Sequence, residues 1–303
     1  MTSPRLSTVV VAWRSGRDTA ELVERFPVDP RFELVVVDNG GQEELAPRPG
    51  LTLVRPGRNL GFAAGSNAGA RAARGDLLLF LNPDARPEGD PFSALVAGFE
   101  ARPEAAGLVP RLAGEDGAEQ SRWQLRPLPG PLALLAHAFF WNPTRGPRRE
   151  PAPGCAIEQP AAAALALRRG EFEAVGGFDE AYWPAWFEDV DLARRLADRR
   201  RPLLYHPDAR FRHRVGSSLP ALGYGAFLVA YDRNLRRYLA RHHAPLWAAL
   251  FTALVPVGAL ARLLALPLRK PRRAESRAAA ARALLELARQ GLRRFPEPAE
   301  SAG

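Results

Sequence analysis

The sequence predicts an α/β protein in which a mostly parallel sheet carries helices on its faces and a helical, basic region follows. Short apolar runs alternate with helix-like segments through the first 218 of the 303 residues. Two of these runs end in a carboxylate, at Asp38 and Asp84, and most of the excess positive charge lies after residue 240. We therefore expect an α/β domain over residues 1–218 and a C-terminal helical region over residues 219–303.

The first half of the chain has the order of βαβ units. Apolar runs predict strands at residues 6–13, 32–37, 51–54 and 77–81, and amphipathic or small-residue segments predict helices at 18–26 and 65–73. The run Leu77–Leu81, bounded by Gly75 and Pro83, is short for a helix and typical of a strand buried on both faces. Strands that alternate with helices pair in parallel through right-handed crossovers.

The second half is less regular. Its patterns predict helices at 92–102 and from 188, and strands at 106–109, 161–168, 201–205 and 211–213. Residues 111–160 contain many prolines and show no clear period, so we expect irregular structure there.

Composition and charge exclude some classes of function. The net charge is +9, but residues 241–303 carry eleven Arg and Lys against four Glu, so the preceding chain is nearly neutral. The sequence of residues 1–240 shows no cluster of basic residues interleaved with aromatic residues, which argues against nucleic-acid binding. The single cysteine, Cys155, allows no internal disulfide. The N-terminus passes directly into a strand-like run instead of a signal peptide, so we expect a cytoplasmic catalytic domain.

Two carboxylates follow predicted strands in the first half. In an open α/β sheet, ligands bind beyond the carboxyl ends of the strands. Asp38 could therefore accept a hydrogen bond from a nucleotide, and Asp84 could bind a divalent cation on its phosphates. The glycine-rich segment 59–69 between them suits a close approach to an anionic ligand. The alternative is that these segments are ordinary turns and a tight helix contact.

A second acidic cluster, Glu188, Asp189 and Asp191, begins the helix predicted from residue 188. Acids at a helix start complement its dipole, which is a structural explanation. The aromatic residues that precede the cluster could instead raise the pKa of a carboxylate toward that of a general base. His213 ends the last predicted strand and becomes a candidate metal ligand if a metal binds nearby.

Six short motifs occur in a fixed order between residues 6 and 218. They are Asp38-Asn-Gly, Asn59-Leu-Gly-Phe-Ala-x-Gly-x-Asn67-x-Gly, Leu-Asn82-Pro-Asp84-Ala, Gly176-Gly-Phe-Asp-Glu180, Glu188-Asp-x-Asp-Leu and His213-x-x-Gly-Ser217. In this order they resemble the family-2 glycosyltransferases, in particular the rhamnosyltransferase-like branch. The resemblance implies a Rossmann-like GT-A fold, a nucleotide-sugar donor, a divalent cation (Mg²⁺ or Mn²⁺) and inversion at the anomeric carbon.

The resemblance also implies roles for individual residues. Asp38 would contact the base or ribose, Asp84 and His213 would bind the metal, and Asp189 would be the general base with Glu188 beside it. The expected donor-binding residues are Ala12, Trp13, Asp38, Asn59, Gly61, Asn67, Asn82 and Asp84. Trp186 and Asp191 are expected on the acceptor side.

The C-terminal region contains an uncharged run from Pro245 to Ala261, which Pro256 and Gly258 interrupt. It is short for a spanning helix. We expect interfacial helices on an anionic membrane surface, held by the basic segment 269–273. The alternative is a helix pair that packs on the domain or in a dimer seam. We also expect a basic amphipathic helix at residues 274–294 and a disordered end beyond it.

These observations lead to one main hypothesis and two alternatives. The main hypothesis is an inverting, metal-dependent glycosyltransferase on the inner face of the cell membrane. It would move a sugar, with rhamnose as the expected one, from a dTDP- or UDP-sugar to a lipid-linked or polysaccharide acceptor. The alternatives are a metal-dependent nucleotidyltransferase and a non-catalytic nucleotide-sugar-binding or membrane scaffold protein.

Overall fold

The computed structural model describes residues 4–40, 44–147, 149–214, 222–268, 270–271 and 273–291. The chain forms two compact units. The first comprises Met1–Leu128, Arg145–Glu180 and Glu188–Ser218, and the second comprises Pro129–Thr144, Ala181–Phe187 and Leu219–Gly303. Two segments that the sequence analysis placed with the first 218 residues, 129–144 and 181–187, thus belong to the second unit. The expected disorder of the chain end, Gly216 and Ser217 of the sixth motif, and Arg269 and Arg272 of the basic segment lie outside the described residues.

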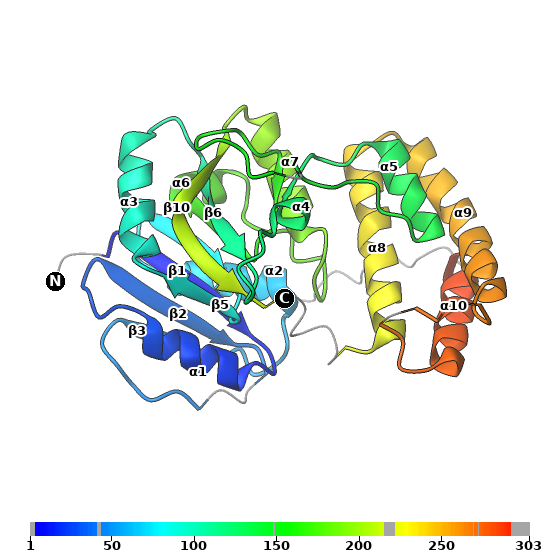
Figure 1. The fold of residues 1–303 in the computed structure, drawn as a ribbon, viewed down its shortest axis with the longest axis horizontal. Coiled ribbons are helices and arrows are strands. Elements are labelled where there is room, and N and C mark those ends of the chain that lie inside the picture. The colour runs from blue at the N-terminus through cyan, green and yellow to red at the C-terminus, as the bar shows by residue number, and fades with distance from the viewer. Residues whose placement is uncertain are drawn as a thin grey trace. The chain divides into compact units, whose positions relative to one another are not determined.

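The first unit is built on an eight-stranded sheet in the order β3-β2-β1-β4-β9-β6-β10-β5 (Figure 1). Its strands are β1 (Leu6–Ala12), β2 (Phe32–Asp38), β3 (Leu51–Val54), β4 (Leu77–Leu81), β5 (Ala85–Glu88), β6 (Gly107–Ala113), β9 (Ala164–Arg168) and β10 (Leu203–His213). All are parallel except β9, which runs antiparallel to β4 and β6, and β5, which runs antiparallel to β10. The prediction of a mostly parallel sheet is confirmed.

Helices cover both faces of this sheet, as its strands require. The helices are α1 (Gly16–Arg25), α2 (Gly61–Ala72), α3 (Pro91–Ala101), α6 (Arg169–Ala174) and α7 (Glu188–Asp198). Apolar residues of α1 and α3 join one buried cluster, and those of α2, α6 and α7 join another on the opposite face. Because both faces are covered, β2 and β4 are fully buried, β4 is apolar on both sides, and β2 is apolar apart from Glu33 and Asp38.

Helix α2 begins four residues before the predicted start at Gly65. Asn59 explains the earlier start, because its side-chain oxygen accepts a hydrogen bond from the backbone of Gly61 at 2.9 Å. The helix lies very close to the sheet, since a Cβ added to Gly69 would stand 2.4 Å from a methyl group of Val9.

Several elements differ from the sequence-based expectation. Strand β5 lies where only a turn was expected, and the two predicted strands at 201–205 and 211–213 are one strand with an irregularity between His206 and Arg210. The region 111–160, expected to be irregular, holds short elements. In the first unit these are helix α4 (Ser121–Gln124) and a two-stranded sheet of β7 (Leu125–Arg126) and β8 (Gln159–Pro160).

The second unit is helical, as the sequence predicts. Its elements are α5 (Pro131–Ala136), the short 3₁₀ helix η1 (His137–Phe139), α8 (Tyr224–His242), α9 (Pro245–Leu264) and α10 (Arg277–Gly291). Helix α8 also holds the segment 181–187, because the buried amide of Asn234 donates hydrogen bonds to the carbonyls of Ala185 at 2.8 Å and Trp186 at 3.0 Å.

Candidate active site

Asp84 and His213 meet at the carboxyl edge of the sheet. Their side chains are almost fully buried, and His213 Nε2 lies 3.4 Å from Asp84 Oδ1. Asn82 is the third member, with its side-chain nitrogen 3.2 Å from the same Nε2. The contact arises because residues 82–84 lead from β4 to β5, which pairs Ala85 with His213. The two residues expected to share a metal are therefore neighbours.

Gln120 fixes the orientation of His213. The imidazole Nδ1 lies 3.0 Å from Gln120 Oε1, and Gln120 Nε2 donates to the His213 carbonyl at 2.8 Å. A side-chain oxygen accepts a hydrogen bond, so Nδ1 carries a proton and Nε2 faces Asp84. The ring of Trp123 packs against the imidazole, with 5.4 Å between the centroids.

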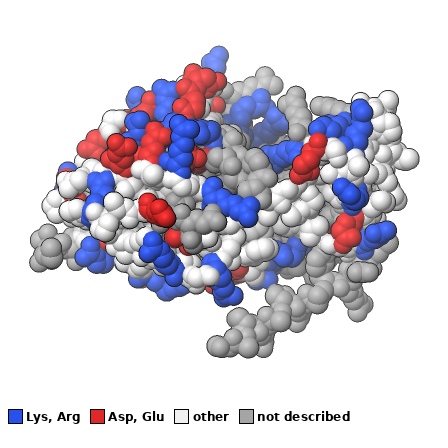
Figure 2. Space-filling model, turned by 90° about the horizontal axis from the view of Figure 1, so that it is seen from below, with Lys and Arg blue, Asp and Glu red and all other residues white. Residues whose placement is uncertain are grey.

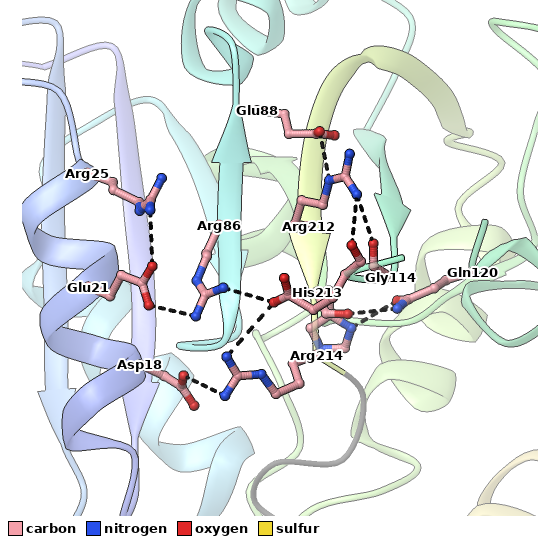
Figure 3. Close-up of polar contacts among 11 residues, drawn as sticks. Asp18, Glu21, Arg25, Arg86, Glu88, Gly114, Gln120, Arg212, His213 and Arg214 are labelled. Atoms are coloured by element: carbon pink, nitrogen blue, oxygen red, sulfur yellow. Dashed lines mark hydrogen bonds and ion pairs between the residues drawn. The ribbon is translucent and has the colours of Figure 1, made fainter. Parts of the chain in front are cut away.

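The residues on either side of His213 belong to a network of ion pairs that anchors the end of β10 (Figure 3). Arg212 bonds to Glu88 of β5 at 2.8 Å, and Arg214 pairs with Asp18 of α1 at 3.4 Å. Arg86 pairs with Glu21 at 2.6 Å and links α1 to β5. Such a network holds several side chains at once, so it fixes the strand end better than one exposed pair.

The donor set at this edge fits a divalent cation that also binds a substrate. The described residues contain no group of three or more His, Cys, Asp or Glu side chains that could hold a metal alone. Asp84 and His213 supply one carboxylate and one imidazole nitrogen, both of which bind Mn²⁺. Hard divalent cations often take few protein ligands and complete their shell with substrate phosphates and water.

Asp38 stands at the same edge of the sheet, at the end of β2. It is 2% exposed, pairs in register with Ala12 of β1, and has Arg55 Nε 3.6 Å from its carboxylate. Because β2 and β4 flank β1 at strand spacing, the ends of β2 and β4 are about 10 Å apart. A nucleoside diphosphate can span that distance.

The neighbouring donor residues expected from the sequence are held together through Asn39. Its amide donates to Asn59 Oδ1 at 2.8 Å and accepts from the backbone of Leu60 at 2.8 Å, next to Gly61. Trp13 follows β1 at this edge, with the guanidinium of Arg14 5.0 Å from its ring centroid. Asn39 therefore joins the end of β2 to the start of α2.

Asn67 has a structural task that the sequence did not indicate. Its amide donates to the Phe178 carbonyl and to Glu180 Oε1, both at 2.9 Å, and accepts from the Phe178 backbone at 3.0 Å. It thus fixes the Gly-Gly-Phe-Asp-Glu segment against α2. These contacts use the amide within the protein, so contact with the donor stays a prediction.

Glu188 and Asp189 begin α7, and the backbone of Val190 donates to Asp189 Oδ1 at 2.8 Å. The backbone N–H of Ala162 lies near the Asp189 carboxylate and lowers its pKa. The next residue, Ala163, accepts a hydrogen bond at 3.0 Å from the backbone of Asn82. Since consecutive Cα atoms are about 3.8 Å apart, Asp189 lies close to the segment that carries Asp84.

Burial raises the pKa of both acids. For Glu188 the largest cause is desolvation, followed by the charge of Asp189, and its pKa lies well above the usual range. Its Oε2 is buried without a hydrogen-bond partner among the described residues. Desolvation also raises the pKa of Asp189, but the charge of Arg126 and backbone hydrogen bonds oppose the rise. Glu188 therefore keeps its proton to higher pH, and Asp189 is the ionised member of the pair.

Two side chains from the small two-stranded sheet interact with Asp189. The Nε2 atom of Gln159, in β8, lies 3.5 Å from Asp189 Oδ2. Arg126, in β7, pairs in register with Gln159. Gln159, Arg126 and Gln120 were not expected from the sequence. No local pattern marks these three residues, because each acts on a residue distant in the chain. Asn39 lies in the Asp38-Asn-Gly motif, but no role was expected for it.

The two residues expected on the acceptor side have other surroundings. Asp191 is fully buried and forms an ion pair with Arg195 at 2.7 Å, and Arg195 donates to the carbonyl of Gly177 at 2.8 Å. These contacts hold α7 on the 175–177 turn, and the expected acceptor-side role of Asp191 stays a prediction. Trp186 belongs to the second unit, where its ring packs on Phe227 with 4.9 Å between centroids. Its contact with an acceptor stays a prediction.

Comparisons with known proteins agree with this geometry. The chain is 29% identical to an N-acetylglucosaminyl-diphospho-decaprenol L-rhamnosyltransferase of Mycobacterium tuberculosis, over 71% of this chain and 77% of that protein. Among solved structures, GalNAc-T7 with UDP, GalNAc and Mn²⁺ has a TM-score of 0.58 at 17% identity, over 79% of this chain. The chain spans 48% of the length of that protein. A mannosyltransferase of Pyrobaculum calidifontis in complex with GDP-Man and Mn²⁺ has a TM-score of 0.52 at 19% identity, over 97% of this chain and 82% of its own.

The likeness to these solved structures confirms the predicted GT-A fold. Residues 11–169 also match the model of the family described as Glycosyl transferase family 2. This match includes β2, β4 and the segment that carries Asp84. Because it spans more than half of the sequence, the chain belongs to glycosyl transferase family 2.

Proposed function

We propose that this glycosyltransferase inverts the anomeric centre of a nucleotide-bound sugar and depends on a divalent cation. The observation that carries the proposal is the link through Ala162 and Ala163. The backbone N–H of Ala162 lies near the Asp189 carboxylate and lowers its pKa, and the Ala163 carbonyl accepts a hydrogen bond from the backbone of Asn82. The proposed base and the Asp84–His213 pair therefore lie toward the same edge of the sheet. Donor and acceptor can then react between them.

The donor side is formed by residues at the ends of β1, β2 and β4. Asp38 is placed to accept hydrogen bonds from the base or ribose of a dTDP- or UDP-sugar. Asp84 and His213 would hold Mg²⁺ or Mn²⁺, which when bound neutralises the charge that develops on the departing diphosphate. Gln120 keeps His213 in the tautomer that such binding needs.

The transfer itself requires a base on the opposite side of the sugar. Asp189 removes the proton of the acceptor hydroxyl as its oxygen forms a bond to the anomeric carbon. The bond from that carbon to the nucleoside diphosphate breaks at the same time, and the diphosphate leaves with the electron pair. Glu188, which keeps its proton, leaves the negative charge on Asp189.

Rhamnose is the sugar that we propose, and a lipid-linked sugar is the proposed acceptor. The support is the name of the mycobacterial relative, which transfers L-rhamnose to an N-acetylglucosaminyl-diphospho-decaprenol. Membership in a glycosyltransferase family also favours sugar transfer over the nucleotidyltransferase and the scaffold alternatives. A nucleotidyltransferase would release pyrophosphate, whereas the proposed reaction releases a nucleoside diphosphate.

The test is transfer by an Asp189→Asn variant. We expect its turnover to fall by a factor of roughly 10² to 10⁴, since the amide cannot take the proton. Donor binding, measured by calorimetry, should stay within about twofold because Asp189 does not hold the nucleotide. The matched control is Asp198→Asn at the exposed end of the same helix, which should transfer like the unchanged enzyme. Full turnover by the Asp189 variant would remove the proposed base.

A further inference from the structure

We propose that helix α9 docks on the surface of an anionic lipid bilayer through its exposed apolar face. The exposed residues of that face are Leu246, Ala249, Leu250, Ala253, Val257, Leu260, Ala261 and Leu264. At 100° per residue all eight fall within one side of the helix, and the 18-residue span corresponds to about 27 Å. No polar side chain interrupts this apolar face.

Single exposed apolar residues are common on soluble proteins, but a continuous exposed row along one helix is not. The large side chains of the apolar face are well exposed, for example Leu246 at 64% and Leu264 at 81%. An ordinary surface helix buries its apolar side and shows its polar side to water. Helix α9 has apolar residues on both sides, so its outer side needs a partner.

The opposite side of α9 packs against other helices of the second unit. Phe251, Val255, Gly258 and Ala259 are buried, and α9 packs against α8, α10, α5 and η1 (Figure 1). At Gly258 the helix touches the backbone of η1, since an added Cβ would stand 1.8 Å from the Ala138 carbonyl oxygen. The close contact fixes which side faces outward.

Docking on a bilayer surface fits better than crossing it. Among the described residues, α9 is the one helix long and apolar enough to span a membrane by length and composition. A spanning helix would have to leave the bundle and expose its packed side to lipid. Pro256 lies within it, and Arg262 near its end stacks on Phe140 with 5.0 Å to the ring centroid. An interfacial position keeps all of these contacts.

Exposed side chains elsewhere in the second unit favour anionic lipid as the partner. Phe139, in η1, and Trp141, two residues after it, are exposed, and tryptophan favours the headgroup level of a bilayer. Lys270 and Arg273 are exposed shortly after α9 and can attract anionic headgroups. Figure 2 shows uncharged surface over part of the second unit, interrupted by Lys and Arg and by some Asp or Glu. A second copy of the chain would instead bring these like charges together.

The experiment measures cosedimentation of the full chain with vesicles of phosphatidylcholine, alone or with about 30% phosphatidylglycerol. We expect binding to the anionic vesicles, and a loss of roughly tenfold or more in the Val257→Glu/Leu260→Glu double variant. Both positions are about half exposed, at 53% and 51%, so the fold tolerates the changes, and thermal unfolding checks this. The control is Val28→Glu, an exposed apolar position of the first unit, which should bind like the unchanged protein.

Neither donor nor acceptor is present in this assay, so its outcome is independent of the proposed transfer reaction. The inference is overturned if the unchanged protein does not sediment with anionic vesicles, or if the double variant sediments equally well. A dimer in analytical ultracentrifugation that the double variant converts to a monomer would also overturn it, because the apolar face would then be a seam between two copies.

Discussion

At the scale of single residues, the neighbouring acids Glu188 and Asp189 have different surroundings. Glu188 is 6% exposed and has an unpartnered oxygen, whereas Asp189 accepts backbone hydrogen bonds and lies near Gln159 and Arg126. The first environment favours a neutral acid and the second an anion. Among the described residues, the buried Glu188 oxygen has no hydrogen-bond partner, so Glu188 lowers the stability of the folded protein. Such a cost is expected where a residue serves function, here beside the proposed base Asp189.

This predicts that Glu188→Gln stabilises the fold at neutral pH while it impairs transfer. The pKa of Glu188 in the folded state lies above its unfolded value of about 4.3. The stability that its neutral carboxyl contributes is therefore fully present below a pH of about 4.3. Stability is then lost as pH rises through the folded-state pKa, because only the unfolded chain gives up the proton easily. Glutamine has no proton to lose. The gain in unfolding free energy should therefore grow between acidic and neutral pH, to roughly 1 to 3 kcal/mol.

Chemical denaturation at pH 4 and pH 8 measures this gain, because the first value lies below the unfolded pKa of about 4.3 and the second lies well above it. Glu173→Gln makes the same chemical change at an exposed helical position and serves as the control. The unfolding free energies of the Glu188 variant and the unchanged protein could instead differ by the same amount at both pH values. That result would contradict a raised pKa of Glu188 in the folded protein.

Sequence reasoning identified the residues that carry charge at strand and helix ends, and it did not identify their supports. Asp84 and His213 were expected as partners, and the structure brings them within 3.4 Å. Gln120 and Gln159 are amides without any local pattern, and they contact residues 93 and 30 positions away. Only the tertiary fold creates such contacts. Asp191, expected on the acceptor side, is fully buried and paired with Arg195, a contact that the charge pattern alone did not indicate.

At the scale of elements, α2 positions the donor side by lying unusually close to the sheet. Gly65 and Gly69 face β1, where an added Cβ would stand 2.9 Å from Val11 and 2.4 Å from Val9. Valine is stiff about its first side-chain torsion and cannot easily move aside. The small residues of α2 therefore set the distance between this helix and the ends of β1 and β2.

We predict that Gly69→Ala destabilises the protein by about 1 to 3 kcal/mol, because the extra methyl overpacks this contact. Denaturant unfolding measures the change. Gly170→Ala in α6 is the matched control, since a Cβ there meets nothing within 4 Å and alanine is the better helix former. Equal stabilities for the two variants would contradict the close packing of α2.

Elements with a strong period were predictable, and those defined by long-range contacts were not. The buried strands β1, β2 and β4 follow from short apolar runs, and α10 lies within the predicted range 274–294. Strand β5 has the sequence Ala-Arg-Pro-Glu, which carries no strand signal and pairs only because β10 offers an edge. The same holds for β7 and β8, whose two-residue pairing closes a loop of more than thirty residues.

At the scale of the whole molecule, the two proposed tasks belong to different units. Asp38, Asp84, His213 and Asp189 all lie in the first unit, and the apolar face of α9 lies in the second. The uneven charge of the sequence reflects this division, since most of the excess Arg and Lys follows residue 240. Substitutions in one unit can therefore separate sugar transfer from membrane binding.

The central claim is that Asp84 and His213 bind the cation of a nucleoside diphosphate. A crystal of the protein with UDP and Mn²⁺, measured at the manganese absorption edge, tests it most directly. We predict an anomalous peak about 2.0 to 2.6 Å from an Asp84 oxygen and from His213 Nε2. An Asp84→Asn crystal should lose the peak, whereas Asp76→Asn, at the exposed opposite end of β4, should keep it. A nucleotide and manganese bound away from both side chains would contradict the account.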